Sequence, residues 1–144
     1  MQVSTFARYG LRAMIRLALL SYSDNRVVSI KEIAEYENIS AKYLESIFST
    51  LKKGKFIISY KGKNGGYKLS RPADSITSLE IVELLDEKLT PINCRINKDV
   101  CVNKTGECTV MGLWIELDDS INAILSKKTL QNLVDETFES RISN

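Results

Sequence analysis

The stretch from Ile39 to Ser70, ISAKYLESIFSTLKKGKFIISYKGKNGGYKLS, contains the signals that decide the fold. Ser40 is suited to cap a helix, because its side-chain oxygen can accept a hydrogen bond from a backbone N–H group in the first turn. An apolar face then recurs at helical spacing, formed by Tyr43, Leu44, Ile47, Phe48 and Leu51. Gly54 follows as a C-cap. The stretch therefore begins with a helix that buries one face.

The second part of the same stretch predicts a β-hairpin. Two short β-rich runs, KFIISY and YKLS, flank a turn that contains Gly62, Asn64, Gly65 and Gly66. Upstream, VVSIKEIAEYENIS predicts a short helix with Ser29 as N-cap, Glu32 completing a capping box and Asn38 ending it. Two helices separated by three or four residues match a helix-turn-helix, and the basic hairpin after them is the layout of a winged helix.

The charge of the chain is divided along its length. Residues 1–72 contain 13 Lys/Arg and 5 Asp/Glu, whereas residues 73–144 contain 7 and 13. Residues 40–71 alone hold eight basic residues and one acid. Since Arg71-Pro72 also disfavours a helix, we expect a DNA-binding domain over 1–72 and a second region over 73–144, which could pack with the first as one domain.

The predicted recognition helix and hairpin supply groups that suit DNA. Lys42 can donate to guanine, Glu45 can accept from cytosine, and serines can do either. Lysines at the end of the helix and at the hairpin tip suit phosphate and the minor groove, whereas Tyr43 lies on the apolar face and is as well suited to the core. The candidate DNA-binding residues are Arg8, Ser40, Lys42, Tyr43, Glu45, Ser46, Lys52, Lys53, Lys61 and Lys63.

The first predicted helix, from about Thr5 to Ser21, has apolar residues on more than one face and is mostly buried. Arg8, Arg12 and Arg16 lie four residues apart and form a basic stripe. Two interpretations stay open: the stripe is a solvated face, or its N-terminal end contacts phosphate.

The C-terminal half predicts three further helices. SLEIVELLDEK begins a short helix at Ser78, and a last helix covers about Leu130 to Phe138. Between them lies a long amphipathic helix with an apolar stripe from Val110 to Leu125 and an acidic back at Glu116, Asp118 and Asp119. The stripe packs against its own domain or also against a second copy of the chain.

All three cysteines, Cys94, Cys101 and Cys108, lie in one stretch with six residues between neighbours. Thiolates suit iron-sulfur clusters and zinc, and the wide spacing favours a cluster over one small ion. A single metal, a metal-free thiol redox switch and chance are the alternatives. The chain has no histidine, which excludes imidazole-based zinc sites and the Ser/His and Cys/His catalytic pairs. We expect no enzyme.

The sequence lacks a signal peptide and any apolar run of about 20 residues that could span a membrane. We therefore expect a cytoplasmic protein with no membrane partner, in a compartment where thiols stay reduced.

The chain resembles the bacterial winged-helix regulators typified by the iron-sulfur cluster regulator IscR, the nitric-oxide sensor NsrR and the cysteine-metabolism regulator CymR. The similarity lies in RYGLRAM, ISAKYLESIFSTLKKG, KGKNGGYKLSRPADSIT and the three-cysteine segment that leads into GLW. It implies a mainly α fold with a small β-hairpin wing, and a homodimer that crosses its long C-terminal helices. It also implies a palindromic DNA operator and a [2Fe-2S] or [4Fe-4S] cluster on Cys94, Cys101 and Cys108.

The chain departs from this family's pattern in its cysteine spacing and in having Met111 and Arg8 where relatives place a fourth ligand. That ligand stays open among Glu107, Asp99, Met111, solvent and a small thiol. The resemblance implies a sequence-specific transcriptional repressor that senses iron-sulfur, redox or nitrosative status. The alternatives are a metal-free thiol-sensing regulator and an iron-sulfur electron carrier or adaptor.

Overall fold

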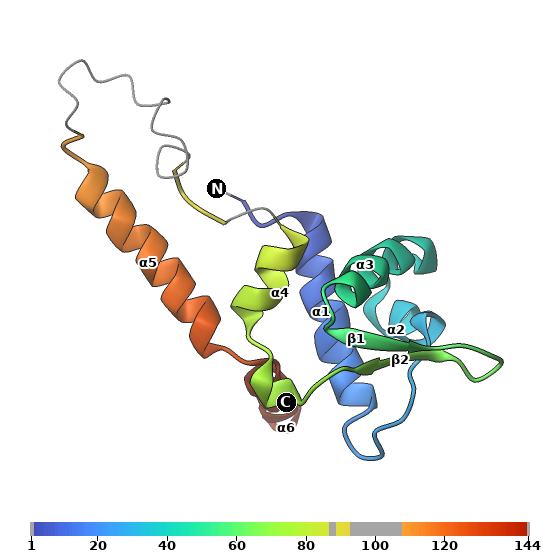
Figure 1. Ribbon diagram of the computed structural model, residues 1–144. Coiled ribbons are helices and arrows are strands. Elements are labelled where there is room, and N and C mark those ends of the chain that lie inside the picture. The colour runs from blue at the N-terminus through green and yellow to red at the C-terminus, as the bar shows by residue number, and fades with distance from the viewer. Residues whose placement is uncertain (1, 87–88, 93–107, 144) are drawn as a thin grey trace.

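The computed structural model describes residues 2–86, 89–92 and 108–143. These residues form six α-helices, a short 3-10 turn and one antiparallel hairpin (Figure 1). The elements in chain order are α1 (Thr5–Leu20), α2 (Ile30–Glu37), α3 (Ala41–Lys53), β1 (Ile57–Tyr60), β2 (Gly66–Leu69), η1 (Ala73–Ser75), α4 (Ser78–Leu85), α5 (Met111–Lys127) and α6 (Leu130–Ile142). The predicted fold class, mainly α with a small wing, is confirmed.

The helix-turn-helix begins and ends as its caps predict, with one difference. The hydroxyl oxygens of Ser29 and Ser40 accept from backbone N–H groups in the first turns of α2 and α3, and Asn38 ends α2 with a left-handed φ of 52°. The predicted capping box at Ser29 is wrong. The Glu32 carboxylate instead binds the Arg26 guanidinium at 2.5 and 3.0 Å, because a hydrogen bond between two charged groups is stronger than one to a neutral backbone N–H.

The wing is anchored to the body by a third extended segment. In the hairpin Ile57 pairs with Leu69 and Tyr60 with Gly66, and β2 also pairs with Val28 on its other side. Gly66 is required at this crossing, because a Cβ there would lie 2.2 Å from the Val28 carbonyl oxygen. The hairpin therefore projects from a fixed base.

One hydrophobic core joins the two halves of the chain. It contains Leu17 of α1 and Phe48 of α3, and it also contains residues beyond position 72, namely Ile76, Ile81, Leu85, Leu130 and Val134. The boundary at residue 72 stays a prediction, but α4 and α6 pack on α1 and belong to the same core.

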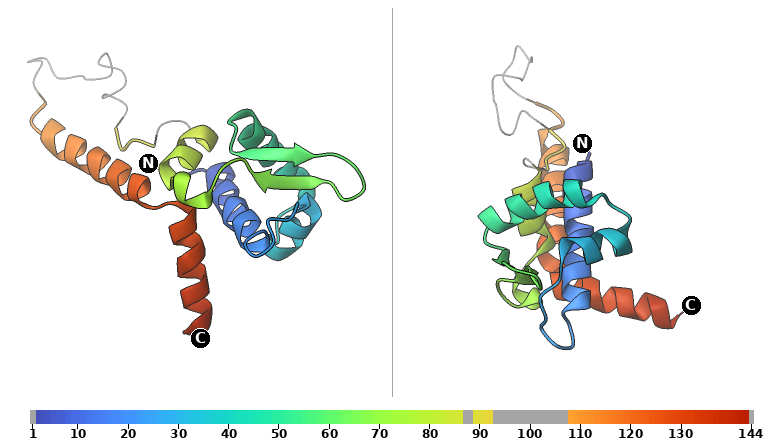
Figure 2. Two further views of the ribbon diagram at one scale, coloured as in Figure 1. Left: turned by 60° about the horizontal axis from the view of Figure 1, so that its bottom comes forward. Right: turned by 90° about the vertical axis from the view of Figure 1, so that its right-hand side faces the viewer.

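Helix α5 lies apart from this body (Figures 1 and 2). It runs beside α4, and the chain then turns sharply into α6, which packs on α1 and η1. Two backbone hydrogen bonds of 2.8 Å fix the turn: Ser78 N–H donates to the Lys128 carbonyl, and Leu130 N–H donates to the Ile76 carbonyl. One end of α5 is thus fastened to the winged helix.

Candidate nucleic-acid interface

Helix α3 has a buried apolar face and an exposed polar face at its start. Leu44, Ile47, Phe48 and Leu51 are buried. Four of the predicted contact residues are exposed and lie in or just before the first two turns: Ser40, Lys42, Glu45 and Ser46. The helix can therefore present these side chains to a partner without disturbing the core.

Hydrogen bonds within α3 decide which part of each serine hydroxyl is available. The Ser40 oxygen accepts from the Tyr43 N–H at 3.1 Å, so its proton can be donated to a ligand. The Ser46 hydroxyl donates to the Tyr43 carbonyl at 2.7 Å, so its oxygen is left to accept. The two serines offer complementary hydrogen-bonding groups.

Tyr43 is half-buried in an aromatic cluster rather than exposed. Its ring meets those of Phe6 and Tyr9 edge-on, with centroids 6.0 and 5.9 Å apart and planes at 89°. Such edge-to-face pairs stabilise packing. Tyr43 thereby connects the first turn of the recognition helix to α1.

The end of α3 forms a Schellman motif with an unusual residue. Phe56 N–H donates to the Leu51 carbonyl, and Lys55 N–H donates to the Lys52 carbonyl. Gly54 is the C-cap as predicted, with an ordinary φ of −74°, whereas exposed Lys55 has the left-handed φ of 63°. The candidate contacts Lys52 and Lys53 are exposed in the last turn, where their charge also suits the helix dipole.

The tip of the wing presents two lysines to solvent. Lys61 and Lys63 are exposed, on either side of Gly62, whose φ is 109°. Behind the tip, the Lys68 ammonium lies 5.6 Å from the centre of the Tyr60 ring, a contact that the sequence did not predict. The wing therefore carries its charge on a turn whose geometry requires glycine.

Arg71 fastens the base of the wing to α4. Its guanidinium lies over the Phe56 ring and donates to the Ser75 carbonyl and to the Glu80 carboxylate, at 2.7 and 2.9 Å. The backbone N–H of Thr77 and then Arg71 lower the pKa of Glu80. Thr77 and Glu80 form a capping box that the sequence analysis missed.

The predicted arginine stripe on α1 divides between two roles. Arg8 is exposed and donates to the Thr5 hydroxyl at 3.1 Å. Arg12 and Arg16 instead bind the Glu37 carboxylate at the end of α2, at 3.0 and 2.7 Å. Arg8 is thus the member of the stripe available for phosphate, while the other two hold the helix-turn-helix to α1. A contact between residues more than 20 positions apart has no local signal.

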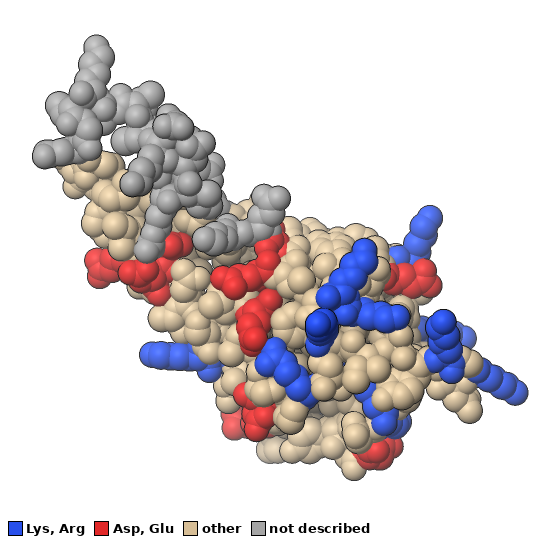
Figure 3. All heavy atoms as spheres, viewed as in Figure 1, with Lys and Arg blue, Asp and Glu red and all other residues tan. Residues whose placement is uncertain are grey.

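Lys and Arg side chains gather over α3 and the wing, while Asp and Glu gather mainly towards α4 and α5 (Figure 3). The division of charge along the chain is therefore also a division between two regions of the surface in this view. The structure brings the α3 and wing lysines onto one cationic side, as a phosphate-binding surface requires.

Of the three candidate metal ligands, Cys94 and Cys101 lie outside the described residues. Cys108 is half-buried, and its carbonyl accepts from the Met111 N–H at the start of α5, at 3.2 Å. In the described part of the chain no group of three or more His, Cys, Asp or Glu could hold a metal. The donor chemistry fits an iron-sulfur cluster, since thiolates are the ligands that such clusters take.

Most apolar residues of helix α5 lie on two neighbouring sides, and exposed Ile115 lies apart from both. Trp114, Ile121 and Leu125 are half-buried on one side. The other side is exposed and is called the open strip below: Val110, Leu113, Leu117 and Ile124. The predicted position of Asp118 on an exposed acidic back is wrong, since this residue is only 8 % exposed. At 3.6 residues per turn, position 118 shares a side with positions 114, 121 and 125.

These features define a winged-helix DNA-binding protein. The family model described as "Rrf2: Iron-dependent Transcriptional regulator" matches residues 3–136, and the chain belongs to that family. It is therefore a helix-turn-helix transcriptional regulator, and its relatives are regulators rather than enzymes. Within 2–86, 89–92 and 108–143, no helix is long and apolar enough to cross a membrane.

Known relatives include transcriptional regulators named IscR and a global cysteine regulator named CymR. The chain is 31 % identical to the transcriptional regulator IscR of Cereibacter sphaeroides, over 93 % of this chain and 87 % of that protein. The solved structure of CymR, the global cysteine regulator of B. subtilis, matches with a TM-score of 0.80 and 32 % identity, over 94 % of this chain and 98 % of that one. The solved structure of T. potens IscR matches with a TM-score of 0.77 and 27 % identity, over 97 % of this chain and 90 % of that one.

Proposed function

We propose that this protein is a homodimeric repressor that binds a palindromic operator, with the state of a three-cysteine iron-sulfur site setting its affinity for DNA. The observation that carries the proposal is the joining of two surfaces: a cationic α3 and wing, and an α5 whose open strip is uncovered in the single chain. The first suits one half-site, and the second suits a second copy that supplies the other half-site.

Base reading falls to the exposed start of α3. Lys42 donates to guanine and Glu45 accepts from the cytosine amino group. Ser46, whose proton already binds the Tyr43 carbonyl, acts as an acceptor. The lysines at the end of α3 and at the wing tip, together with Arg8, contact phosphate, so that binding weakens as salt rises.

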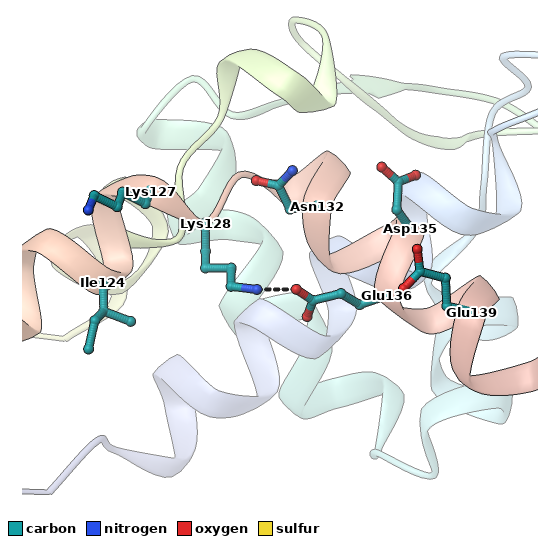
Figure 4. A pocket seen from close by; sticks show the side chains of 7 residues that line it. All are labelled: Ile124, Lys127, Lys128, Asn132, Asp135, Glu136 and Glu139. Atoms are coloured by element: carbon teal, nitrogen blue, oxygen red, sulfur yellow. Dashed lines mark hydrogen bonds and ion pairs between the residues drawn. The ribbon is translucent and has the colours of Figure 1, made fainter. Parts of the chain in front are cut away.

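Dimerisation falls to the open strip. Leu113 is 57 % exposed and Ile124 is 64 % exposed. The strip reaches a pocket at the turn between α5 and α6. Ile124 lines this pocket, and Figure 4 shows the ion pair of Lys128 and Glu136 within it. Burial of such apolar side chains against a second copy is favourable, and a two-fold axis would place two recognition helices on successive turns of DNA.

Cys94, Cys101 and Cys108 would hold the cluster, which would supply a centre that responds to iron, oxidants or nitric oxide. The coupling of this centre to DNA binding would come from the residues of the chain around it. Cys108 is tied by its backbone to the first turn of α5, so its position is coupled to the dimerisation helix. A change there alters the separation of the two α3 helices, to which half-site binding is sensitive.

The first test is an absorption spectrum of anaerobically purified protein, with iron and sulfide analysis. We expect coloured protein with both elements, and colour lost in Cys101→Ser. Thr109→Ala changes an exposed neighbour of Cys108 and should stay coloured, as the matched control. Colourless protein without iron or sulfide after anaerobic reconstitution would refute the cluster.

A metal-free thiol switch is the second candidate, and the similarity to a cysteine regulator favours it. Arg95, Lys98 and Lys104 stand near the cysteines in sequence, and positive charge lowers a thiol pKa and favours the reactive thiolate. Mass spectrometry after peroxide treatment separates the two: an intramolecular disulfide in iron-free protein supports the switch. The family assignment gives no support to the electron-carrier alternative.

A further inference from the structure

The last turn of α4, together with its C-cap Asp86, stands directly before residues 87–107, which include two of the three cysteines. Its three residues, Leu84, Leu85 and Asp86, each reach a different part of the DNA-binding half. They are called the α4 end below.

Leu85 lies between α1 and α3 in a space that a glycine leaves. A Cβ on Gly10 of α1 would lie 2.1 Å from the Leu85 Cδ1 atom and 3.3 Å from the Ile47 Cγ2 atom of α3. No side chain is possible at position 10 unless Leu85 moves. Since Leu85 is buried against both helices, a displacement of the α4 end must be taken up by them, because packed cores shift between discrete arrangements rather than deform smoothly.

Leu84 makes a second contact, at the C-terminal end of the recognition helix. A Cβ on Gly54, the C-cap of α3, would lie 2.3 Å from the Leu84 Cδ2 atom. The φ of Gly54 is −74°, which any residue adopts. The position therefore needs glycine for space and not for backbone freedom, and the space is filled by the α4 end.

Asp86 reaches the start of α1. Its Oδ2 atom accepts from the Ser4 backbone N–H at 2.8 Å, across 82 positions of sequence. Ser4 is itself the N-cap of α1. The next turns of α1 carry Phe6 and Tyr9, whose rings hold Tyr43 in the first turn of α3.

We infer that the α4 end is the link that sets the position of α3 according to the state of the cysteine site, and that Asp86 is its positioning residue. The link acts at both ends of α3, through Leu84 at Gly54 and through Asp86, α1 and Tyr43. The inference rests on the proposed function, because it concerns how the site in that proposal reaches the DNA.

The test is a comparison of DNA affinity in four proteins: wild type, Cys108→Ser, Asp86→Ala and the double variant. The probe is a duplex selected from a random library by the anaerobically purified wild type, and affinity is measured by fluorescence anisotropy. The quantity compared is the ratio of dissociation constants with and without Cys108. Typical coupling between two sites changes affinity about 5- to 150-fold.

In the Asp86→Ala background we expect this ratio to fall by a factor of about 3 to 10, the scale of one hydrogen bond. Asp86→Asn keeps an oxygen that can accept from Ser4 and should restore the ratio. Glu83→Ala removes an exposed carboxylate from the same helix and should leave it unchanged. Amide hydrogen exchange in the first turn of α3 should differ between wild type and Cys108→Ser and not between the two Asp86→Ala proteins. Both Asp86→Ala proteins should also keep slow exchange at the buried residues of α3, which an unfolded chain would lose.

A ratio in Asp86→Ala within twofold of the wild-type ratio would overturn the inference and leave the proposed function standing. If wild type and Cys108→Ser bind DNA equally, the proposed sensing fails, and the inference fails with it.

Discussion

Helices α3 and α5 are both amphipathic, but only α3 completes its apolar face within the chain. Four of its apolar side chains are buried, and its caps and both flanking turns are hydrogen-bonded. Helix α5 is longer, yet its one buried residue is an aspartate, Asp118, and its open strip faces solvent. The apolar face of α3, the proposed DNA-reading helix, is thus covered within one chain, whereas the apolar face of α5 would be covered by the second copy that we propose.

The largest expected effect is a loss of stability when the buried apolar face of α3 is disrupted. Phe48→Ala should lower the free energy of unfolding by about 3–5 kcal/mol, because it removes a fully buried ring and leaves a cavity. Urea denaturation followed by circular dichroism measures the loss. Ser49→Ala changes the exposed neighbour in the same helix and should have little effect. A loss below about 1 kcal/mol for Phe48→Ala would mean that the α3 face is not closed as described.

The next effect concerns the open strip of α5 and the proposed dimer. Leu113→Lys combined with Leu117→Lys should raise the dimer dissociation constant at least about 100-fold, because it places charges in the proposed interface. Sedimentation velocity should then show a monomer, and circular dichroism should show that its helices are retained, since both side chains are exposed in the single chain. Ser126→Lys introduces the same charge on another side of α5 and should remain dimeric. A double variant that stays dimeric would refute the role of the open strip.

A smaller effect is expected when the wing lysines of the proposed DNA-binding surface are removed. Lys61→Ala combined with Lys63→Ala should weaken operator binding about tenfold and reduce the slope of log K against log salt by about 2 per protomer, because two phosphate contacts are lost. Arg141→Ala, exposed on α6, removes a charge far from the wing and should change neither. Anisotropy titrations between about 50 and 200 mM salt provide both quantities. Unchanged affinity would remove the wing from the interface.

The smallest effect is a pH dependence within the helix-turn-helix. The hydrogen-bonded Arg26 lowers the pKa of Glu32 below 4.5. Because the folded value lies below the unfolded one, this pair stabilises the protein above about pH 4.5 and the contribution is lost as pH falls through the lowered pKa. Both groups are partly exposed, so Glu32→Gln should cost only about 0.5 kcal/mol at pH 7.

The measurement for Glu32→Gln is urea denaturation at pH 7 and at successively lower pH. The difference from wild type should shrink towards zero on acidification, whereas Glu35→Gln, exposed on the same helix, should give no such trend. A difference that grows as pH falls has the wrong sign for this ion pair.

Much of the fold was predictable because its signals are local. The serine caps, the apolar spacing of α3 and the glycines of the wing turn each act within a few residues, and the structure agrees with them. The cationic side also followed from the sequence, since the lysines sit on two elements that are adjacent in the chain.

The contacts that the sequence did not reveal depend on how the chain packs, and most of them join residues far apart in the chain. Glu37 captures Arg12 and Arg16, Glu32 prefers Arg26 to its own cap, and Asp86 binds Ser4. In each case a charged group meets a partner brought near by packing, and a one-dimensional pattern does not contain that proximity. The burial of Asp118 is different: its spacing from Trp114 was visible, but an acid was assumed to face solvent.

The fixed turn between α5 and α6 makes α5 a lever. The helix has 17 residues and so extends about 25 Å at 1.5 Å per residue. Its Lys128 end is held to Ser78 and the neighbouring strand-like bridge of Thr77 and Thr129, while Cys108 stands just beyond the opposite end. A tilt of about 5° around the fixed end would therefore carry the Cys108 end through about 2 Å at this length, so a small angular change at the body becomes a displacement as long as a bond to a metal.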